Sequence, residues 1–308
     1  MKIYFLFPGQ GAQAVGMGKE LYAADTCVRQ RFDEACDILG FDLKKIMFEG
    51  PDNALKQTEN TQPALFVNSF AIYEFFARAG VSSNCTAGHS LGEYTAIAAA
   101  GGFDFATGLK LVRQRGLLMA RATKGTMAAV MGADSAVIEK ICGEISQAGD
   151  VVVPANQNTP DQTVISGTPE GVKKASDALI VAGAKRVVPL QVSGAFHSPL
   201  MQEAAEQMKD ALASAPIRDT KVPVISNVTA QPVTVGAVIR DLLYQQLFSP
   251  VRWVASFENA EAGIAVEMGP GKILMGLLRK INRNIQVVPA ATMAEIDQAL
   301  QTAGSVLV

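Results

Sequence analysis

The feature of this sequence best suited to chemistry is a serine between two glycines, Gly88-His89-Ser90-Leu91-Gly92. Strand-like residues precede it and helix-like residues follow it, so Ser90 lies in a sharp strand-to-helix turn with the Gly-x-Ser-x-Gly spacing. Such a turn needs glycine on both sides and holds the hydroxyl out into a cleft. The Leu91 amide at the start of the helix can stabilise the oxyanion formed when a carbonyl is attacked. The pattern predicts a serine nucleophile that moves acyl groups.

The same segment has a second interpretation. Ser90-Leu91-Gly92-Glu93 also fits the capping box Ser-x-x-Glu, in which the serine only caps a helix. A cap does not require glycine on both sides of the serine, so the spacing favours the nucleophile.

A serine hydroxyl needs a base, and the chain offers two histidines. His89 is adjacent to Ser90, and successive side chains of an extended segment point to opposite faces, so it is badly placed. His197 stands in a loop between a predicted strand and a helix opened by Pro199. Elimination therefore favours His197, although a lone histidine is otherwise more often a surface or core residue. No acid stands near it in sequence, so its orienting partner is distant or a backbone carbonyl.

A glycine loop, Phe7-Pro8-Gly9-Gln10-Gly11-Ala12-Gln13-Ala14, follows the first predicted strand. It formally contains Gly-x-Gly-x-x-Ala, but a dinucleotide site needs a second strand ending in an acid about 20 residues later. Residues Arg29–Leu39 have helical period instead, so we exclude that site. A loop at the carboxyl end of a strand is still where an α/β sheet contacts ligands, and Gln10 can donate an N–H to an oxyanion.

A basic residue falls among apolar positions of the predicted helix Phe105–Ala122. Arg115 lies in the stripe of Leu111 and Leu118, and a buried guanidinium needs an anion to offset its desolvation. The anion can be an internal carboxylate or the carboxylate of a substrate, which the guanidinium can bind with two hydrogen bonds.

Composition and charge fit a compact enzyme. The 308 residues are 49% hydrophobic and 18% charged, with a formal net charge of -2. No Lys/Arg-rich block is present, so we expect neither nucleic acid nor a membrane as partner. The first apolar run has no cleavage pattern behind it, and no run approaches the roughly 18 to 20 residues that span a bilayer. We expect a cytoplasmic monomer.

Cysteine spacing argues against a metal site. The four cysteines have no Cys-x-x-Cys spacing, and two histidines add few ligands. We therefore expect free thiols, no metal and no cofactor. The four are Cys27, Cys36, Cys85 and Cys142.

Short strand-like runs alternate with helical stretches, which predicts an α/β fold around a mainly parallel sheet. The predicted strands are Lys2–Phe7, Asn84–Gly88, Val222–Ser226 and Ala265–Met268. The predicted helices are Val28–Leu39, Pro63–Ala79, Ser90–Ala100, Phe105–Ala122, Pro199–Ala215 and Gly236–Phe248.

One segment departs from this alternation of strands and helices. It reads strand, helix, strand, strand, helix, strand, the βαββαβ order of a ferredoxin-like unit. Its elements are Met127–Met131, Ser135–Gln147, Val151–Ala155, Gln162–Ser166, Glu170–Ala182 and Arg186–Val192. We predict a small subdomain, 126–196, inserted into a discontinuous core of residues 1–125 and 197–308.

Six motifs occur together in one order. They are Phe7-Pro8-Gly9-Gln10-Gly11-Ala12-Gln13, Thr61-Gln62-Pro63-Ala64, Gly88-His89-Ser90-Leu91-Gly92-Glu93-Tyr94, Arg115-Gly116, Gly194-Ala195-Phe196-His197-Ser198 and Glu267-Met268-Gly269-Pro270-Gly271-Lys272. This ordered set resembles the malonyl-CoA:acyl carrier protein transacylases of fatty-acid synthesis. The resemblance runs from Met1 to about Ile281 and fades beyond Arg283.

The resemblance implies an α/β-hydrolase-like core with the inserted ferredoxin-like subdomain. It also implies ping-pong chemistry, in which Ser90 takes malonyl from malonyl-CoA and gives it to the phosphopantetheine thiol of acyl carrier protein. Gln10 and the Leu91 amide would form the oxyanion hole and Arg115 would hold the malonyl carboxylate. The backbone carbonyl of Gln246 would orient His197.

Two further residues are expected to contact the substrate. Phe196 resembles the residue that precedes the histidine in malonyl-selective members, and Met119 lies on the apolar face of the helix that carries Arg115.

Three alternatives stay open. A serine hydrolase or thioesterase would share the same machinery but release the acyl group to water, and it has no need of Arg115. A polyketide-type acyltransferase would use another extender unit or carrier. A non-catalytic carrier-binding module would use Ser90 only as a helix cap.

Overall fold

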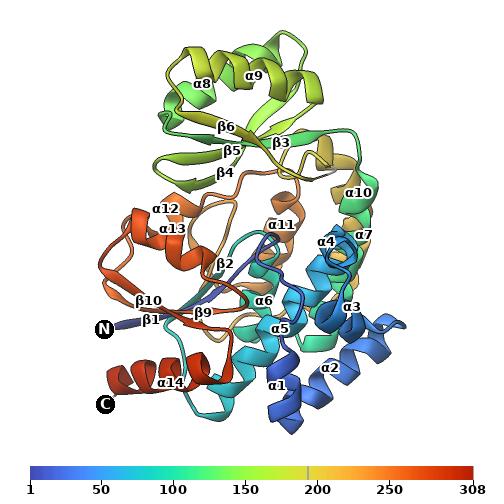
Figure 1. Cartoon of the computed structure of the whole chain (residues 1–308), viewed down its shortest axis with the longest axis vertical. Helices are drawn as coiled ribbons and strands as arrows, with labels where there is room; N and C mark the ends of the chain where they lie inside the picture. The colour runs from blue at the N-terminus through green and yellow to red at the C-terminus, as the bar shows by residue number, and fades with distance from the viewer. Residues whose placement is uncertain (193, 308) are drawn as a thin grey trace.

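The computed structural model describes residues 1–192 and 194–307. Ser193, next to the histidine motif, and Val308, the last residue of the expected core, lie outside the described residues. The larger part of the molecule surrounds a six-stranded sheet of order β10-β9-β1-β2-β7-β8 (Figure 1). The strands pair in parallel except for β8, which is antiparallel to β7. They are β1 (Lys2–Phe7), β2 (Cys85–Gly88), β7 (Val224–Ile225), β8 (Pro232–Val233), β9 (Gly263–Met268) and β10 (Ile285–Ala290).

The first strand shows why this sheet is central. Its alternating side chains enter two separate apolar clusters: Phe5 and Phe7 pack on one face, Tyr4 and Leu6 on the other. A strand buried on both faces is continuously apolar, as β1 is. The helices around this sheet are α1 (Lys19–Ala24), α2 (Thr26–Leu39), α3 (Leu43–Glu49), α4 (Asp52–Lys56), α5 (Thr58–Arg78), α6 (Gly92–Ala99), α7 (Phe105–Arg121), the 3₁₀ turn η1 (Pro199–Met201), α10 (Gln202–Ser214), α11 (Gly236–Gln246), α12 (Trp253–Phe257), α13 (Ile273–Ile281) and α14 (Met293–Leu307).

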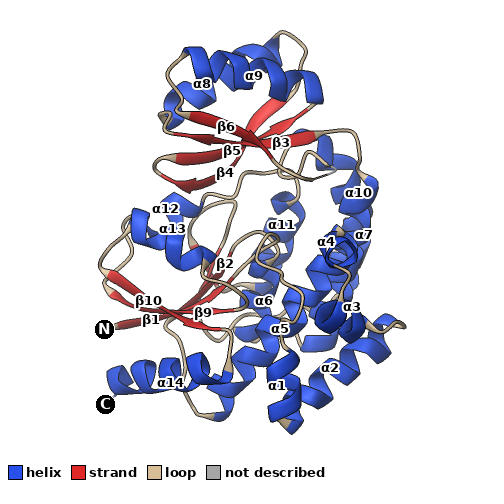
Figure 2. Cartoon of the chain, in the orientation of Figure 1, coloured by secondary structure: helices blue, strands red, loops and turns tan. Residues whose placement is uncertain are grey.

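The smaller part has its own antiparallel sheet of order β4-β5-β3-β6 and its own apolar cluster. Both of its helices cover the face directed away from the larger sheet (Figure 2). Its elements are β3 (Thr126–Met131), α8 (Ser135–Gln147), β4 (Val152–Thr159), β5 (Gln162–Gly167), α9 (Pro169–Val181) and β6 (Arg186–Pro189). The βαββαβ order is the predicted one. We propose that the two sheets mark the two domains, 126–196 and the discontinuous remainder.

The smaller sheet is hydrogen-bonded to the larger part of the molecule through its edge strand β4. Val251 donates its N–H to Ala155 and accepts the N–H of Gln157, both at backbone positions of β4. Lys280 of α13 also forms an ion pair with Asp161, at the turn between β4 and β5. The edge strand is thereby covered rather than left open.

The expected helix at Pro63 begins earlier, because α5 starts at Thr58 with Pro63 inside it. Proline has no N–H and leaves the carbonyl of Glu59, four residues before it, without its helical donor. Arg113 of α7 supplies the missing donor, its Nη1 lying 2.6 Å from Glu59 O. The contact from α7 therefore allows Pro63 to stand inside α5, where the sequence alone would predict the start of a helix.

Three other helix and strand boundaries also differ from the predicted ones. The helix predicted from Ser90 begins at Gly92, the strand predicted to end at Ala155 continues to Thr159, and the last strand of the small sheet ends at Pro189. None of the helices within the described ranges has both the length and the apolar character needed to cross a membrane.

Candidate active site

The turn that carries Ser90 joins β2 to α6 and is held in a strained conformation. Ser90 has a φ of 51°, in the left-handed region that non-glycine residues seldom adopt. The side chain of Asn227 secures it from both sides: Ser90 N donates to Asn227 Oδ1 at 2.7 Å, and Asn227 Nδ2 donates to Gly88 O at 2.7 Å. Strain of this kind persists only where the surroundings impose it.

The glycines of the turn are required by close backbone contacts. A Cβ on Gly92 would lie 2.0 Å from the carbonyl oxygen of Phe7, and one on Gly88 would lie 1.9 Å from the carbonyl carbon of Gly92. A Cβ on Gly9 would lie 2.3 Å from His89 O. The glycine loop after β1 therefore packs directly against the Ser90 turn.

The structure brings Ser90, His197 and Gln246 into one line of hydrogen bonds. Ser90 Oγ lies 2.8 Å from His197 Nε2, and His197 Nδ1 lies 2.9 Å from the backbone oxygen of Gln246. A carbonyl oxygen only accepts, so Nδ1 carries the proton and Nε2 is free to accept the proton of Ser90. His197 itself has a φ of 57°.

Burial keeps this imidazole neutral. Desolvation, with a smaller contribution from the charge of Arg115, lowers the pKa of His197 from 6.5 to about 3. The free site therefore holds His197 in the form that can act as a base.

Arg115 lies against the hydroxyl of Ser90 and is 1% exposed. Its Nη2 is 3.1 Å from Ser90 Oγ and 3.0 Å from Gln246 Oε1, and its Nη1 is 2.9 Å from Gln62 Oε1. Desolvation lowers the pKa of its guanidinium below the ordinary value. Among the described residues no carboxylate forms an ion pair with it, and its Nε has no hydrogen-bond partner. The internal salt bridge considered for Arg115 is thus not formed within this part of the chain.

The two groups expected to stabilise the oxyanion, the Leu91 N–H and the Gln10 side chain, differ in their hydrogen bonds. Within the described part of the chain the Leu91 N–H has no acceptor, and it stands immediately before the first turn of α6. The Gln10 side chain donates instead to Thr58 Oγ1 at 3.2 Å, at the start of α5. One of the two N–H donors of the Gln10 carboxamide is therefore used at the start of α5, and the other has no acceptor among the described residues.

Phe196 and Met119 are both buried. Met119 Sδ lies 3.2 Å from Gln62 Nε2, so it adjoins the residue that binds Arg115. His89 is occupied elsewhere: its Nε2 lies 2.8 Å from Asn158 Oδ1, its ring packs on Trp253, and burial lowers its pKa.

Comparisons with known proteins identify the family of this chain. A family model described as an acyl transferase domain matches residues 4–296. The malonyl CoA-acyl carrier protein transacylase of Bacillus subtilis is 45% identical over 307 residues, 98% of this chain and 97% of that protein. The Escherichia coli protein of that name is 43% identical over 284 residues, 90% of this chain and 92% of its own length. This chain belongs to the malonyl-CoA:acyl carrier protein transacylase family.

Solved structures of malonyl transacylases share the whole fold, which therefore has the predicted α/β-hydrolase-like core and inserted subdomain. The Coxiella burnetii enzyme superposes with a TM-score of 0.93 at 38% identity, covering 98% of this chain and 97% of that one. A malonyl-transacylase in complex with its type II polyketide acyl-carrier protein gives a TM-score of 0.94 at 37% identity, covering 98% and 100%. The expectation that the family likeness fades beyond Arg283 is wrong, since β10 and the start of α14 fall inside the matched range.

Three polar residues that contact the site were not predicted as site residues. Gln62 stands only within the Thr61-Gln62-Pro63-Ala64 motif, and Glu93 only within the capping box and the motif around Ser90. Asn227 lies two residues beyond the end of β7, the parallel strand next to β2, where ligand-side residues of an α/β sheet gather. That position was a usable signal for Asn227.

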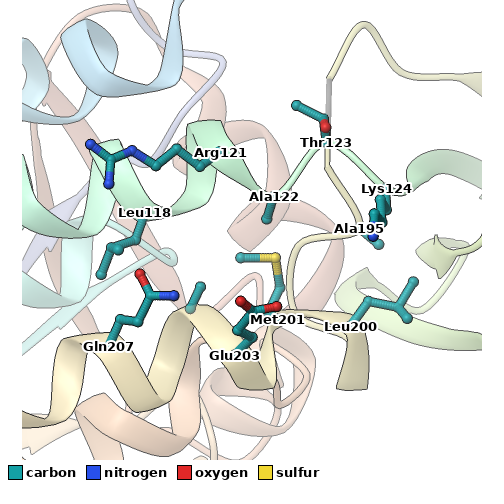
Figure 3. A pocket seen from close by; sticks show the side chains of 11 residues that line it. Leu118, Arg121, Ala122, Thr123, Lys124, Ala195, Leu200, Met201, Glu203 and Gln207 are labelled. Atoms are coloured by element: carbon teal, nitrogen blue, oxygen red, sulfur yellow. The ribbon is translucent and has the colours of Figure 1, made fainter.

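A separate cavity of about 390 Å³ lies between the end of α7 and the start of α10 (Figure 3). Leu118, Arg121 and Lys124 line one side, and Leu200 and Gln207 line the other. Ala195 also lines it, but neither Ser90 nor Arg115 does.

Proposed function

We propose that this chain transfers malonyl from malonyl-CoA to the phosphopantetheine thiol of acyl carrier protein through a Ser90 acyl-enzyme, in fatty-acid biosynthesis. The observation that carries the proposal is the guanidinium of Arg115, buried without a carboxylate partner in the described residues and 3.1 Å from Ser90 Oγ. A cation in this position suits an acyl group that brings its own carboxylate.

In the first half-reaction Ser90 attacks the thioester carbonyl while its proton passes to His197 Nε2. The Leu91 N–H stabilises the oxyanion, and Gln10 joins it when its side chain leaves Thr58. The Gln246 carbonyl stabilises the imidazolium through Nδ1–H. Collapse of the tetrahedral intermediate breaks the carbon–sulfur bond, and His197 returns the proton to the coenzyme A thiolate.

The second half-reaction runs the same steps in reverse with a new thiol. His197 takes the proton of the carrier's thiol, and the thiolate attacks the Ser90 ester. The carbon–oxygen bond of that ester breaks and Ser90 Oγ regains the proton. Atoms and charge balance without a metal or redox cofactor.

The substrate-binding residues follow from the same geometry. Arg115 would bind the malonyl carboxylate with its two terminal nitrogens, while Phe196 and Met119 would border the acyl chain. A general ester hydrolase does not need a buried cation beside its acyl site. The presence of Arg115 therefore favours an enzyme that transfers a carboxylated acyl group.

We place the reaction in the cytoplasm and infer that the enzyme acts as a monomer. All four cysteines are free, as is usual in a reducing compartment.

The test is a transfer assay with malonyl-CoA and carrier protein bearing its phosphopantetheine thiol. We expect malonyl-carrier to form and free malonate to remain a minor product, with both signals lost in Ser90→Ala. Malonate as the main product would instead favour the hydrolase. A carrier from a polyketide system, run in parallel, would distinguish that variant of the function.

A further inference from the structure

A buried hydrogen-bond chain runs beneath the nucleophile and ends at a carboxyl group that the steps above do not use. Glu93, in the first turn of α6, is 3% exposed, and Gln246 is 0% exposed. Gln246 Nε2 donates to Glu93 Oε2 at 2.6 Å and to the backbone oxygen of Ser90 at 2.9 Å. Gln246 Oε1 accepts from Arg115 Nη2 at 3.0 Å. A single carboxamide thus lies between a buried acid and a buried guanidinium.

The orientation of this carboxamide follows from its partners. Turning it over would place Gln246 Nε2 against the N–H groups of Arg115, donor against donor. It would also place Oε1 against the Glu93 carboxyl and the carbonyl oxygen of Ser90, acceptor against acceptor. Guanidinium and carbonyl oxygens have fixed roles, so the observed orientation is the one that satisfies all three neighbours.

Gln246 therefore serves the site through two separate parts. Its backbone oxygen accepts the Nδ1–H of His197 at 2.9 Å. Its side chain contacts Arg115 and the main chain of Ser90, and that side chain is held by Glu93. Displacing the carboxamide would disturb Arg115, whereas the backbone contact to His197 would remain.

Glu93 is also a buried acid close enough to affect Arg115 electrostatically. Burial raises the pKa of Glu93 to about 7, while the Gln246 hydrogen bond and the charge of Arg115 oppose the rise. In turn the charge of Glu93 opposes the desolvation that lowers the pKa of Arg115. Among the described residues Glu93 forms no hydrogen bond to Arg115 itself, so its structural link to the guanidinium runs through the Gln246 side chain.

We propose that Glu93 is a positioning residue for acyl transfer, which acts through the Gln246 side chain to hold the Arg115 guanidinium where the acyl carboxylate binds. This inference rests on the proposed function. It separates two requirements at Gln246: the backbone carbonyl serves the base, and the side chain serves acyl selectivity.

The test compares malonyl-CoA with acetyl-CoA, because acetyl has no carboxylate for Arg115 to bind. The variants are Glu93→Ala, Gln246→Met and their combination, with Glu93→Gln as the conservative control that keeps an acceptor for Gln246 Nε2. Gln246→Met retains the backbone carbonyl and side-chain length, and it tests the idea even if Glu93→Ala does not fold. Thermal unfolding of each variant establishes that it is folded.

We expect the preference in kcat/KM for malonyl over acetyl to fall about tenfold in Glu93→Ala and in Gln246→Met, and to stay within about threefold of the parent in Glu93→Gln. The double variant should lose no more preference than Gln246→Met alone, because Glu93 acts through that side chain. Equal losses for both acyl groups, or additive losses of preference in the double variant, would overturn the inference while leaving the proposed function intact. A parent enzyme that transfers neither acyl group would overturn both.

Discussion

The protonation of His197 depends on burial and on the charge of Arg115. In the free site, desolvation and the neighbouring cation together lower the pKa of His197 to about 3. A substrate carboxylate bound to Arg115 offsets that positive charge, so the pKa of His197 should rise in the loaded enzyme. The base thus becomes stronger when the correct acyl group arrives.

Arg115→Ala should reduce malonyl transfer far more than acetyl transfer. A hydrogen bond between charged groups contributes about 1.5 to 3 kcal/mol, so the selective loss should be about ten- to a hundredfold. Steady-state rates with the two CoA thioesters measure it. Equal losses with both substrates would remove Arg115 from carboxylate binding.

The lowered pKa of His197 also makes stability depend on pH. Between pH 6.5 and about 3 the unfolded chain binds a proton at His197 that the folded chain does not, so stability falls as pH falls through this window. The slope from one such group is at most about 1.4 kcal/mol per pH unit. His197→Gln should therefore lose less stability than the parent on acidification.

Urea unfolding of both proteins at a series of pH values measures this difference. Glu93 and Glu267, whose pKa values burial raises to about 7, titrate in both proteins, so the comparison isolates His197. Parallel stability curves would show that His197 is not held neutral by the fold.

Residues of the site differ in how far the sequence reveals them. Ser90 is marked by a local glycine pattern, and His197 by the scarcity of histidine. The role of the Gln246 backbone carbonyl, which orients His197, follows only from the family resemblance. Gln62, Glu93 and Asn227 contribute through contacts between segments far apart in the chain, such as Gln246 to Glu93. No short-range pattern encodes such contacts.

At the scale of elements, the Ser90 turn requires β1, β2 and α6 to approach each other without side chains between them. Gly92→Ala should destabilise the protein by about 1 to 3 kcal/mol or prevent folding, because the new Cβ meets the Phe7 carbonyl at 2.0 Å. Gly276→Ala, inside α13 with no neighbour within 4 Å of its Cβ, should instead stabilise by about 0.5 to 1 kcal/mol.

Chemical denaturation of the two variants beside the parent gives both values. Similar changes in the two variants would mean that close approach at Gly92 is not what requires glycine there.

Element types were easier to predict than their limits. Strand β1 has the predicted bounds because a continuous apolar run ends at Pro8-Gly9. The start of α5 was missed because Arg113, from another helix, supplies the donor that Pro63 lacks. Strand β10 was not predicted, although it completes one edge of the larger sheet. Its run Ile285–Ala290 contains Gln286 and Pro289, a pattern that an edge strand tolerates.

At the scale of the whole molecule, a second, antiparallel sheet accompanies the larger one, and its βαββαβ order could be predicted from the succession of strands and helices alone. How β4 joins Val251 was not visible, because that contact pairs backbone atoms and leaves no side-chain signature.

We expect the protein to be a monomer in solution. Light scattering after size exclusion should give a mass near 32.5 kDa at all concentrations tested. A stable mass of twice that value would show a dimer and contradict the expectation.

The most direct test of a Ser90 acyl-enzyme is intact-protein mass spectrometry after brief mixing with malonyl-CoA, on the parent and on Ser90→Ala. Carrier protein bearing its thiol is then added. The account predicts a malonyl adduct that maps to Ser90, is absent from Ser90→Ala and moves to the carrier. An adduct on another residue, or transfer to the carrier with Ser90 absent, would contradict it.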